Sequence, residues 1–339
     1  MAAASGENLE KLEDMIVRAA ESTAAHVRAA KAAIGEVIFG QDVVVERALI
    51  TVLSGGHALL VGVPGLAKTK LVDTMGIALG LDARRIQFTP DLMPSDILGA
   101  EVLEESPGGK RSFRFIAGPV FAQLLMADEI NRASPRTQSA LLQAMQEQHV
   151  TIAGARHDLP KPFHVLATQN PLEQEGTYPL PEAQLDRFLM EVDVDYPDLA
   201  AERKILFDTT GAEETRAKPA MTAEDLISAQ RLVRRLPVGE SVMEAILQLV
   251  RSARPGADAG DTVNTTKLIA WGPGPRASQA LMLAVRARAL LDGRFAPSVD
   301  DVLELAEPVL KHRMALTFAA RAEGETIQNV IRQLKARVG

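Results

Sequence analysis

The stretch that decides the fold is Gly62-Val63-Pro64-Gly65-Leu66-Ala67-Lys68-Thr69. The apolar run at 57–61 precedes it and predicts a buried strand, and residues 69–79 after it predict a helix. In this context small residues let successive backbone N–H groups converge on an anion, and the helix N-terminus adds partial positive charge. The sequence therefore predicts a phosphate-binding loop at 62–69.

Side chains of this loop have predicted roles at a bound nucleotide. Lys68 is expected to reach the β- and γ-phosphates, and the Thr69 hydroxyl is expected to ligate Mg²⁺. Ala67 stands where the usual pattern has glycine, and we expect it to adopt a helical conformation that tolerates the added methyl group. The predicted nucleotide contacts of the loop are Gly62, Val63, Pro64, Gly65, Leu66, Ala67, Lys68, Thr69 and Lys70.

An acidic pair, Asp128-Glu129, follows a second apolar run at 124–127. Asp128 at a strand end is placed to hold Mg²⁺, usually through water, and Glu129 is placed to polarise an attacking water. In isolation such a pair is more often a helix start or a surface feature. The phosphate loop in the same region favours the catalytic interpretation.

Other polar residues are candidates for contact with the γ-phosphate. Asn170 closes the next predicted strand, where its amide would position water and sense the phosphate, although an Asn-Pro turn is the common alternative. A guanidinium at a γ-phosphate typically contributes about 10³–10⁵ in rate, and Arg187 and Arg276 are the candidates. Either could instead be a surface ion-pair partner. Arg132 and Arg136 compete for the same roles.

Two regions follow from the hydrophobic pattern. Residues 1–196 contain a predicted N-terminal helix and then alternating strands and helices, as in an α/β core with a parallel sheet. Residues 197–339 read as a smaller, all-helical domain. Two hairpin-like inserts, at about 102–116 and 150–163, interrupt the first region. The expected strands are 59–61, 86–88, 123–127, 164–168 and 190–194.

Helix boundaries in the second region are predicted from capping boxes. These boxes begin at Thr222, Ser241 and Ser298. The Gly- and Pro-rich stretch 255–275 is expected to be a long connection, and 276–291 a helix rich in alanine and leucine.

Composition excludes several classes of protein. The 339 residues suit roughly two domains and carry a net charge of −7, so the molecule offers no overall basic field for nucleic acid. The absence of cysteine excludes disulfides and thiolate metal sites, and the six histidines form no pair at metal-ligand spacing. An acidic N-terminus and the lack of a long apolar run argue against a signal peptide or a membrane span, so we expect a cytoplasmic protein.

The chain resembles MoxR-type AAA+ ATPases across nearly its whole length. The phosphate loop is shared by many nucleotide hydrolases, whereas other strings are more specific to this family, in which alanine at position 67 is also frequent. The segments that carry the resemblance are Ile38-Phe39-Gly40-Gln41, Pro90-Asp91-Leu92-Met93-Pro94-Ser95-Asp96, Ala127-Asp128-Glu129-Ile130-Asn131-Arg132-Ala133, Tyr178-Pro179-Leu180-Pro181-Glu182-Ala183-Gln184-Leu185-Asp186-Arg187-Phe188 and Pro275-Arg276-Ala277.

The resemblance implies an ATPase that uses ATP and Mg²⁺, with an α/β core and a C-terminal helical lid, assembled into a ring that is usually hexameric. By matching position, Asn170 would be sensor 1, Arg187 the arginine finger for a neighbour's ATP, and Arg276 sensor 2. The adenine would be bordered by Ile38, Phe39 and Gly40. The two inserts would line the pore or the partner-facing surface.

The implied function is a chaperone-like assembly or remodelling machine, commonly working beside a protein with a von Willebrand factor A domain. A second possibility is the motor subunit of a metal chelatase, whose partner subunits confer the chemistry. A third is a nucleic-acid motor, which the net charge of −7 disfavours, as does a first insert whose basic groups are only Lys110, Arg111 and Arg114. No nucleic-acid partner is therefore expected.

Overall fold

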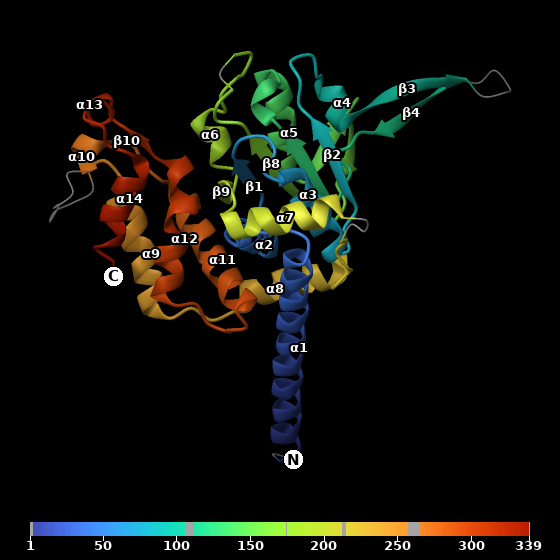
Figure 1. Ribbon diagram of the computed structural model, residues 1–339. Helices are drawn as coiled ribbons and strands as arrows, with labels where there is room; N and C mark the ends of the chain where they lie inside the picture. Colours follow the sequence, from blue (N-terminus) through green and yellow to red (C-terminus); the bar gives the residue numbers. More distant parts are fainter. Residues whose placement is uncertain (1–2, 106–110, 174, 212–214, 257–264, 339) are drawn as a thin grey trace.

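The computed structural model describes residues 3–105, 111–173, 175–211, 215–256 and 265–338, with the side chains of the first helix described from residue 18 onward. Its centre is a five-stranded parallel sheet in the order β2-β5-β8-β1-β9, which confirms the predicted α/β class (Figure 1). The strands are β1 (Ala58–Val61), β2 (Ala83–Gln87), β5 (Leu124–Asp128), β8 (His164–Gln169) and β9 (Met190–Asp193).

Alternate residues of the central strands belong to two different hydrophobic clusters, one on each face of the sheet. Leu60 and Met126 belong to the first cluster, whereas Leu59 and Leu125 belong to the second. Successive side chains of a strand point to opposite faces, and both faces here are covered by helices. This is why the inner strands β1, β5 and β8 contain continuous apolar runs, whereas the edge strand β2 has the sequence Ala-Arg-Arg-Ile-Gln and is partly exposed.

Helices of the first region cover both faces. Residues from α1, α2 and α3 join the first cluster, and residues from α4 and α5 join the second. The N-terminal part of α1 extends away from the body (Figure 1). The bounds are α1 (Ala3–Gly35), α2 (Asp42–Leu53), α3 (Lys68–Ala78), α4 (Pro94–Leu98), η1 (Ile130–Arg132), α5 (Pro135–Glu147) and α6 (Glu182–Leu185).

Both predicted inserts are antiparallel hairpins, formed by β3 (Gly99–Glu105) with β4 (Arg111–Ala117) and by β6 (His149–Ile152) with β7 (Ala155–Asp158). The tip of the first, residues 106–110 with Lys110, lies outside the described residues. The first hairpin projects from the core (Figure 1). The two hairpins contact each other near their bases, where the Phe115 ring stacks on the His157 ring with the ring centroids 3.9 Å apart.

The second region is mainly helical, but the prediction that it contains only helices is wrong. Strands β10 (Ile269–Trp271) and β11 (Ala315–Leu316) form a short antiparallel pair. α10 (Thr265–Leu268) and β10 lie within the connection expected at 255–275. The helices are α7 (Leu199–Thr210), α8 (Ala223–Arg235), α9 (Glu240–Ser252), α10 (Thr265–Leu268), α11 (Pro275–Leu291), α12 (Val299–Leu310), η2 (Lys311–Arg313), α13 (Phe318–Ala322) and α14 (Ile327–Lys335).

Two of the three predicted capping boxes are present. Thr222 caps α8 and Ser298 caps α12, each paired with the acidic residue three positions on. The box predicted at Ser241 is wrong, because α9 already begins at Glu240 with Gly239 at its N-cap. Ser241 therefore lies inside the first turn.

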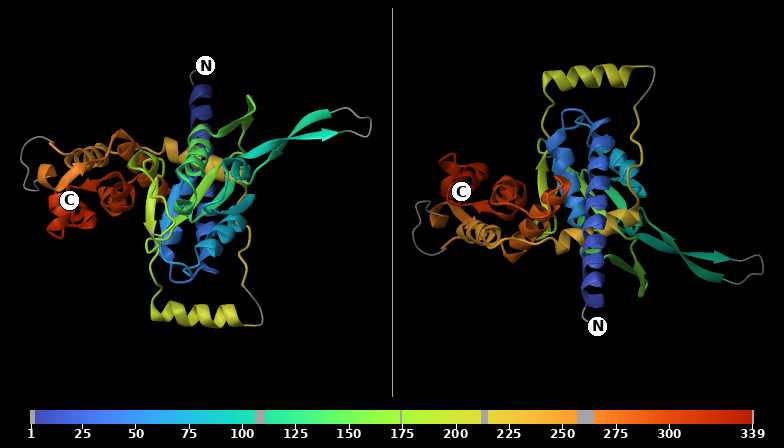
Figure 2. Two further views of the ribbon diagram at one scale, coloured as in Figure 1. Left: turned by 90° about the horizontal axis from the view of Figure 1, so that it is seen from above. Right: turned by 90° about the horizontal axis from the view of Figure 1, so that it is seen from below.

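α7 lies at the periphery of the molecule in both views of Figure 2, and it has no buried residue. By contrast, α8 returns to the core and contacts α1, α2 and α11. Within the part of the chain that the structure describes, no helix is long and apolar enough to cross a membrane.

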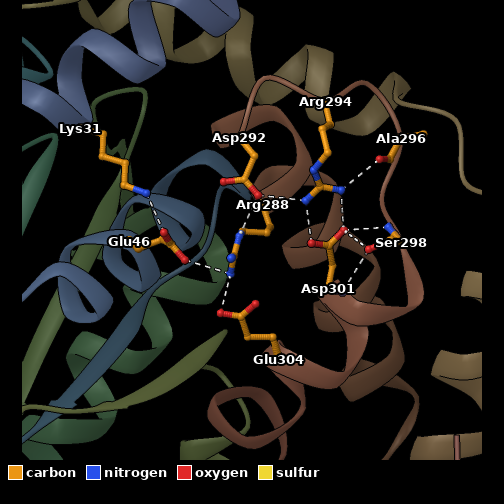
Figure 3. A network of polar contacts seen from close by, with 9 residues as sticks. All are labelled: Lys31, Glu46, Arg288, Asp292, Arg294, Ala296, Ser298, Asp301 and Glu304. Carbon is orange, nitrogen blue, oxygen red and sulfur yellow. Dashed lines mark hydrogen bonds and ion pairs between the residues drawn. The ribbon is translucent and has the colours of Figure 1, made fainter. Parts of the chain in front are cut away.

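A network of ion pairs joins the core to the C-terminal helices (Figure 3). The Glu46 carboxylate on α2 accepts from Lys31 of α1 at 2.6 Å and from Arg288 of α11 at 2.9 Å. Arg288 also pairs with Glu304 of α12 at 3.0 Å and with Asp292 at 3.1 Å. Four helices thus share one set of charges at this joint.

Candidate nucleotide site

The predicted phosphate loop connects β1 to α3. It leaves the sheet at Gly62, where an added Cβ would lie 2.5 Å from the Val194 carbonyl oxygen, so only glycine fits. The loop ends at Ala67, the N-cap of α3, with φ +55° and ψ +20°. The expectation of a helical conformation at Ala67 is therefore wrong. The left-handed region costs an alanine roughly 1–2 kcal/mol, which explains why glycine is usual at this position.

A cavity of about 450 Å³ lies at the carboxyl ends of β1, β5 and β8. Parallel sheets generally bind ligands at this edge. The cavity brings together most of the residues predicted from the sequence. Its lining consists of Pro64, Gly65, Leu66, Ala67, Lys68, Thr69, Lys70, Arg85, Gln87, Asp128, Glu129, Thr168 and Asn170.

The Lys68 ammonium lies within its own loop. It donates to the carbonyl oxygens of Gly62 and Val63, the latter at 3.0 Å. Burial lowers the pKa of Lys68, and the charges of Asp128 and Glu129 oppose that shift. The ammonium is thus held in the cavity by neutral acceptors that an anionic ligand could replace.

Asp128 is 9% exposed and is fixed from two sides. Its Oδ1 accepts from the Thr168 hydroxyl at 2.5 Å, and its Oδ2 accepts from Arg85 Nη2 at 2.5 Å. The Thr168 hydroxyl also accepts from the backbone N–H of Glu129 at 2.8 Å. Thr168 therefore sets the spacing between β5 and β8 where the acidic pair emerges.

The side chain of Glu129 is held by two neighbours. Gln87 Nε2 donates to Oε2 at 2.7 Å, and Arg132 Nη1 donates to the same oxygen at 3.1 Å. Arg132 thus contacts an acid of its own chain, while Arg136 is exposed in the first turn of α5. Sequence reasoning missed Arg85, Gln87 and Thr168 as members of the site.

Asn170 follows β8 and is 6% exposed. Its Oδ1 accepts from the backbone N–H of Leu172 at 3.1 Å, a local turn contact. Because Asn170 also lines the cavity, its place in an Asn-Pro turn is compatible with its facing the cavity.

Arg187 and Arg276 do not line this cavity. They lie in a second cavity of about 270 Å³, together with Gly56, His57 and Leu189. Because these last three residues precede β1 or β9, this cavity lies at the opposite edge of the sheet from the phosphate loop.

The second cavity is rich in arginine. Arg276 Nη1 lies 3.4 Å from Asp186 Oδ2, whereas the buried Nε of Arg187 has no hydrogen-bond partner among the described residues. Arg234 and Arg313 also line the cavity.

The residues predicted to border the adenine lie beneath α7. The Lys204 ammonium of α7 sits 3.9 Å from the centroid of the Phe39 ring. Gly40 has φ +69°, and an added Cβ would lie 2.5 Å from the Ala201 Cβ. Ile38 is buried in the first hydrophobic cluster. These three residues lie outside the lining of the phosphate-loop cavity.

Comparisons with known proteins agree with this geometry. Residues 57–190 match the family model described as "ATPase family associated with various cellular activities (AAA)", and 263–334 match the AAA lid domain. The chain is 43% identical to Chaperone MoxR1 of Mycobacterium tuberculosis, covering 93% of this chain and 83% of that protein. It is 32% identical to Protein MoxR of Paracoccus denitrificans, covering 89% and 92%.

A solved structure also matches over the whole length. The crystal structure of a Cytophaga hutchinsonii protein assigned as an ATPase superposes with a TM-score of 0.88 at 36% identity, covering 98% of each chain. The parallel sheet, the phosphate loop and the lid define the AAA+ class. Within that class, the chain belongs to the MoxR family of AAA+ ATPases.

Proposed function

We propose that this chain hydrolyses ATP with Mg²⁺ in the cavity at the carboxyl edge of the sheet. The observation that carries this proposal is the convergence of the phosphate loop, the Asp128-Glu129 pair and Asn170 on one cavity. Residues 62–70 would hold the phosphates, Glu129 would polarise the attacking water, and Asn170 would orient it. Ile38, Phe39 and Gly40 would border the adenine.

Thr69 and Asp128 fit a magnesium site. Both line the same cavity, and a hydroxyl with a carboxylate is the oxygen donor set that Mg²⁺ prefers. The Thr69 hydroxyl and the Asp128 carboxylate, which Thr168 and Arg85 hold in place, would be the residues that hold the ion. Mg²⁺ would supply charge neutralisation for the transferred phosphoryl group.

The position of the arginines supports a site shared between subunits. Arg187 and Arg276 lie at the edge of the sheet opposite their own phosphate loop, so neither supplies a guanidinium at the γ-phosphate of its own subunit. We place both arginines at a neighbour's ATP in a homo-oligomeric ring, usually of six. Arg132 is less suited to act on a neighbour, because it pairs with Glu129 of its own chain.

Hydrolysis would drive mechanical work on partner proteins. One partner would carry a von Willebrand factor A domain, and the protein would act in the cytoplasm. Two observations support the work on partner proteins. A relative 43% identical is named a chaperone, and the projecting β3–β4 hairpin carries an exposed cross-strand pair, Leu103 with Phe113. We propose that the chain has two domains, a nucleotide-binding core at 1–196 and a lid at 197–339. The second candidate, a chelatase-type motor subunit, would share the same core.

Two variants test the proposed hydrolysis. Lys68→Ala should lose most ATP affinity, because the ammonium in the loop is removed. Glu129→Gln should keep ATP affinity within about twofold yet lose turnover by roughly 10²–10⁴-fold, because only the water-polarising carboxylate changes. Calorimetry with ATP and phosphate release measure the two effects.

Equal ATP binding by Lys68→Ala, or near-normal phosphate release by Glu129→Gln, contradicts the assignment. The exposed loop variant Glu175→Gln serves as a control that retains both properties. Capture of partner proteins by the ATP-bound Glu129→Gln variant would then identify the client, and a salt titration with single-stranded DNA would test the absence of nucleic-acid binding.

A further inference from the structure

A buried arginine of the lid holds the segment that carries Arg187. Arg313, in η2, is 2% exposed. Its Nε donates to Asp186 Oδ1 at 2.8 Å, and its Nη2 donates to the carbonyl oxygen of Phe188 at 2.7 Å. Its Nη1 donates to the carbonyl oxygen of Leu189 at 3.2 Å. The guanidinium thus bonds to residues on both sides of Arg187.

Neighbours of Arg313 reinforce this attachment. His312 Nε2 lies 3.1 Å from the Phe188 carbonyl oxygen, and the Lys311 ammonium pairs with Asp193 of β9 at 2.5 Å. Burial lowers the pKa of His312 well below its usual range, so the ring is neutral and donates through Nε2. Three consecutive lid residues therefore bond to the segment before β9 or to β9 itself.

Asp186 connects this anchor to Arg276. One carboxylate oxygen, Oδ1, accepts from Arg313, and the other, Oδ2, lies 3.4 Å from Arg276 Nη1. Arg313 is buried and held by several acceptors, whereas the Arg276 side chain is 53% exposed and contacts Asp186 at 3.4 Å. The carboxylate is thus fixed on one side by a buried guanidinium and contacts an exposed guanidinium on the other.

We infer that Asp186, anchored by Arg313, is a positioning residue that sets the orientation of Arg187 and Arg276 toward a neighbouring subunit's nucleotide. A planar guanidinium with several simultaneous acceptors fixes the 186–189 segment in a way that lysine, a point charge, cannot reproduce. The carboxylate also keeps Arg276 at the cavity when no phosphate is present. This inference rests on the proposed role of Arg187 and Arg276.

The test uses Asp186→Asn and Arg313→Lys in the full-length chain. Each should lower kcat by roughly 10- to 100-fold, because small displacements of positioning groups have effects of that size. KM for ATP and the affinity for a fluorescent ADP analogue should stay within about twofold, because the phosphate loop is untouched. Asp186→Glu, which keeps the charge, should recover part of the activity lost in Asp186→Asn.

Mixing distinguishes positioning from a general structural defect. Asp186→Asn mixed with Lys68→Ala should regain activity. In such a mixture the Lys68→Ala subunit supplies correctly positioned Arg187 and Arg276 to the intact phosphate-loop cavity of a neighbouring Asp186→Asn subunit. Asp301→Asn is the matched control. Asp301, like Asp186, is a carboxylate that accepts hydrogen bonds from an arginine; its partner is Arg294, at 2.7 and 2.9 Å, and it lies outside the cavity. It should lose stability and keep kcat.

The outcomes separate the inference from the proposed function. If Arg187→Ala and Arg276→Ala are fully active, the shared site itself is wrong. If those two variants are inactive while Asp186→Asn and Arg313→Lys retain wild-type kcat, only the positioning role is overturned. Loss of nucleotide affinity together with kcat, without rescue by Lys68→Ala, also overturns it.

Discussion

Ala67 shows how a single backbone angle affects the phosphate loop. Its φ of +55° is unfavourable for alanine and suits glycine. We predict that Ala67→Gly raises the free energy of unfolding by about 1 kcal/mol, because the left-handed strain is removed. Urea denaturation of the nucleotide-free protein measures this effect.

Ala29→Gly is the matched control for that prediction. Ala29 is exposed in the interior of α1, where glycine should lower stability by about 1 kcal/mol. Opposite signs for the two substitutions are expected. A loss of stability in Ala67→Gly would contradict the left-handed assignment.

At the scale of elements, two buried histidines join β1, β8 and α8 at the amino edge of the sheet. His164 Nδ1 donates to the Gly56 carbonyl oxygen at 2.9 Å, and its Nε2 accepts from Gln230 of α8 at 3.0 Å. His57 Nδ1 accepts from the backbone N–H of Val165 at 2.9 Å. Both rings must be neutral to make these contacts.

The two histidines predict a loss of stability in acid. Burial, with the nearby His164 contributing, lowers the pKa of His57 to about 3, and burial lowers that of His164 to about 4. Between about pH 6.5 and 4 the unfolded chain binds these protons and the folded chain does not, so stability falls as pH falls. The slope should approach about 1.4 kcal/mol per pH unit for each histidine.

Urea denaturation at pH 7, 6 and 5 measures that slope. His164→Gln should be less stable at pH 7 but show a smaller slope, because one titrating group is removed. Ala29→Gly, at an exposed position of α1, changes no titrating group and is the control, so it should keep the wild-type slope. A wild-type slope in His164→Gln would contradict the assignment.

The sequence was sufficient to predict the elements that make strong local patterns. The inner strands β1, β5 and β8 contain continuous apolar runs because both faces of the sheet are buried there, and Thr222 and Ser298 carry readable capping boxes. The edge strand β2 has the largely polar sequence Ala-Arg-Arg-Ile-Gln, and the strand predicted at 86–88 overlaps it by only two residues. The strands β10 and β11 have only three and two residues, too few for a periodic pattern. Their existence depends on pairing across more than forty positions.

Contacts within the site were less predictable than the motifs. Arg85 reaches Asp128 across 43 positions, and Arg313 reaches Asp186 across 127. Neither arginine stands in a distinctive local pattern, so its partner follows only from the order of the strands and the return of the lid. The left-handed angle at Ala67 likewise depends on how the loop joins β1 to α3.

At the scale of the whole molecule, the separation of the two cavities predicts that activity depends on assembly. Specific ATPase activity should rise with protein concentration, because each site needs arginines from another subunit. Arg187→Ala should bind ATP normally yet hydrolyse it roughly 10³-fold more slowly, in line with the contribution of an arginine finger supplied by another subunit. Sedimentation and phosphate release over a concentration series measure both properties.

Mixing Arg187→Ala with Lys68→Ala should restore part of the activity, whereas neither variant regains activity alone. The exposed Arg156→Ala variant, on the second hairpin, is the control and should behave as wild type in this assay. If a verified monomer hydrolyses ATP at a rate per subunit that does not depend on protein concentration, the shared site is ruled out.

The placement of the two cavities at opposite edges of one sheet also restricts symmetry. A twofold pair cannot engage both cavities of both chains at once, because an isologous contact uses one surface patch of each chain and cavities at opposite edges of the sheet do not share a patch. Only a head-to-tail arrangement can, and it has a direction. In any open row of subunits, the terminal phosphate loop has no donor, so one site stays idle. Closure of the row into a ring is the step that removes the idle site.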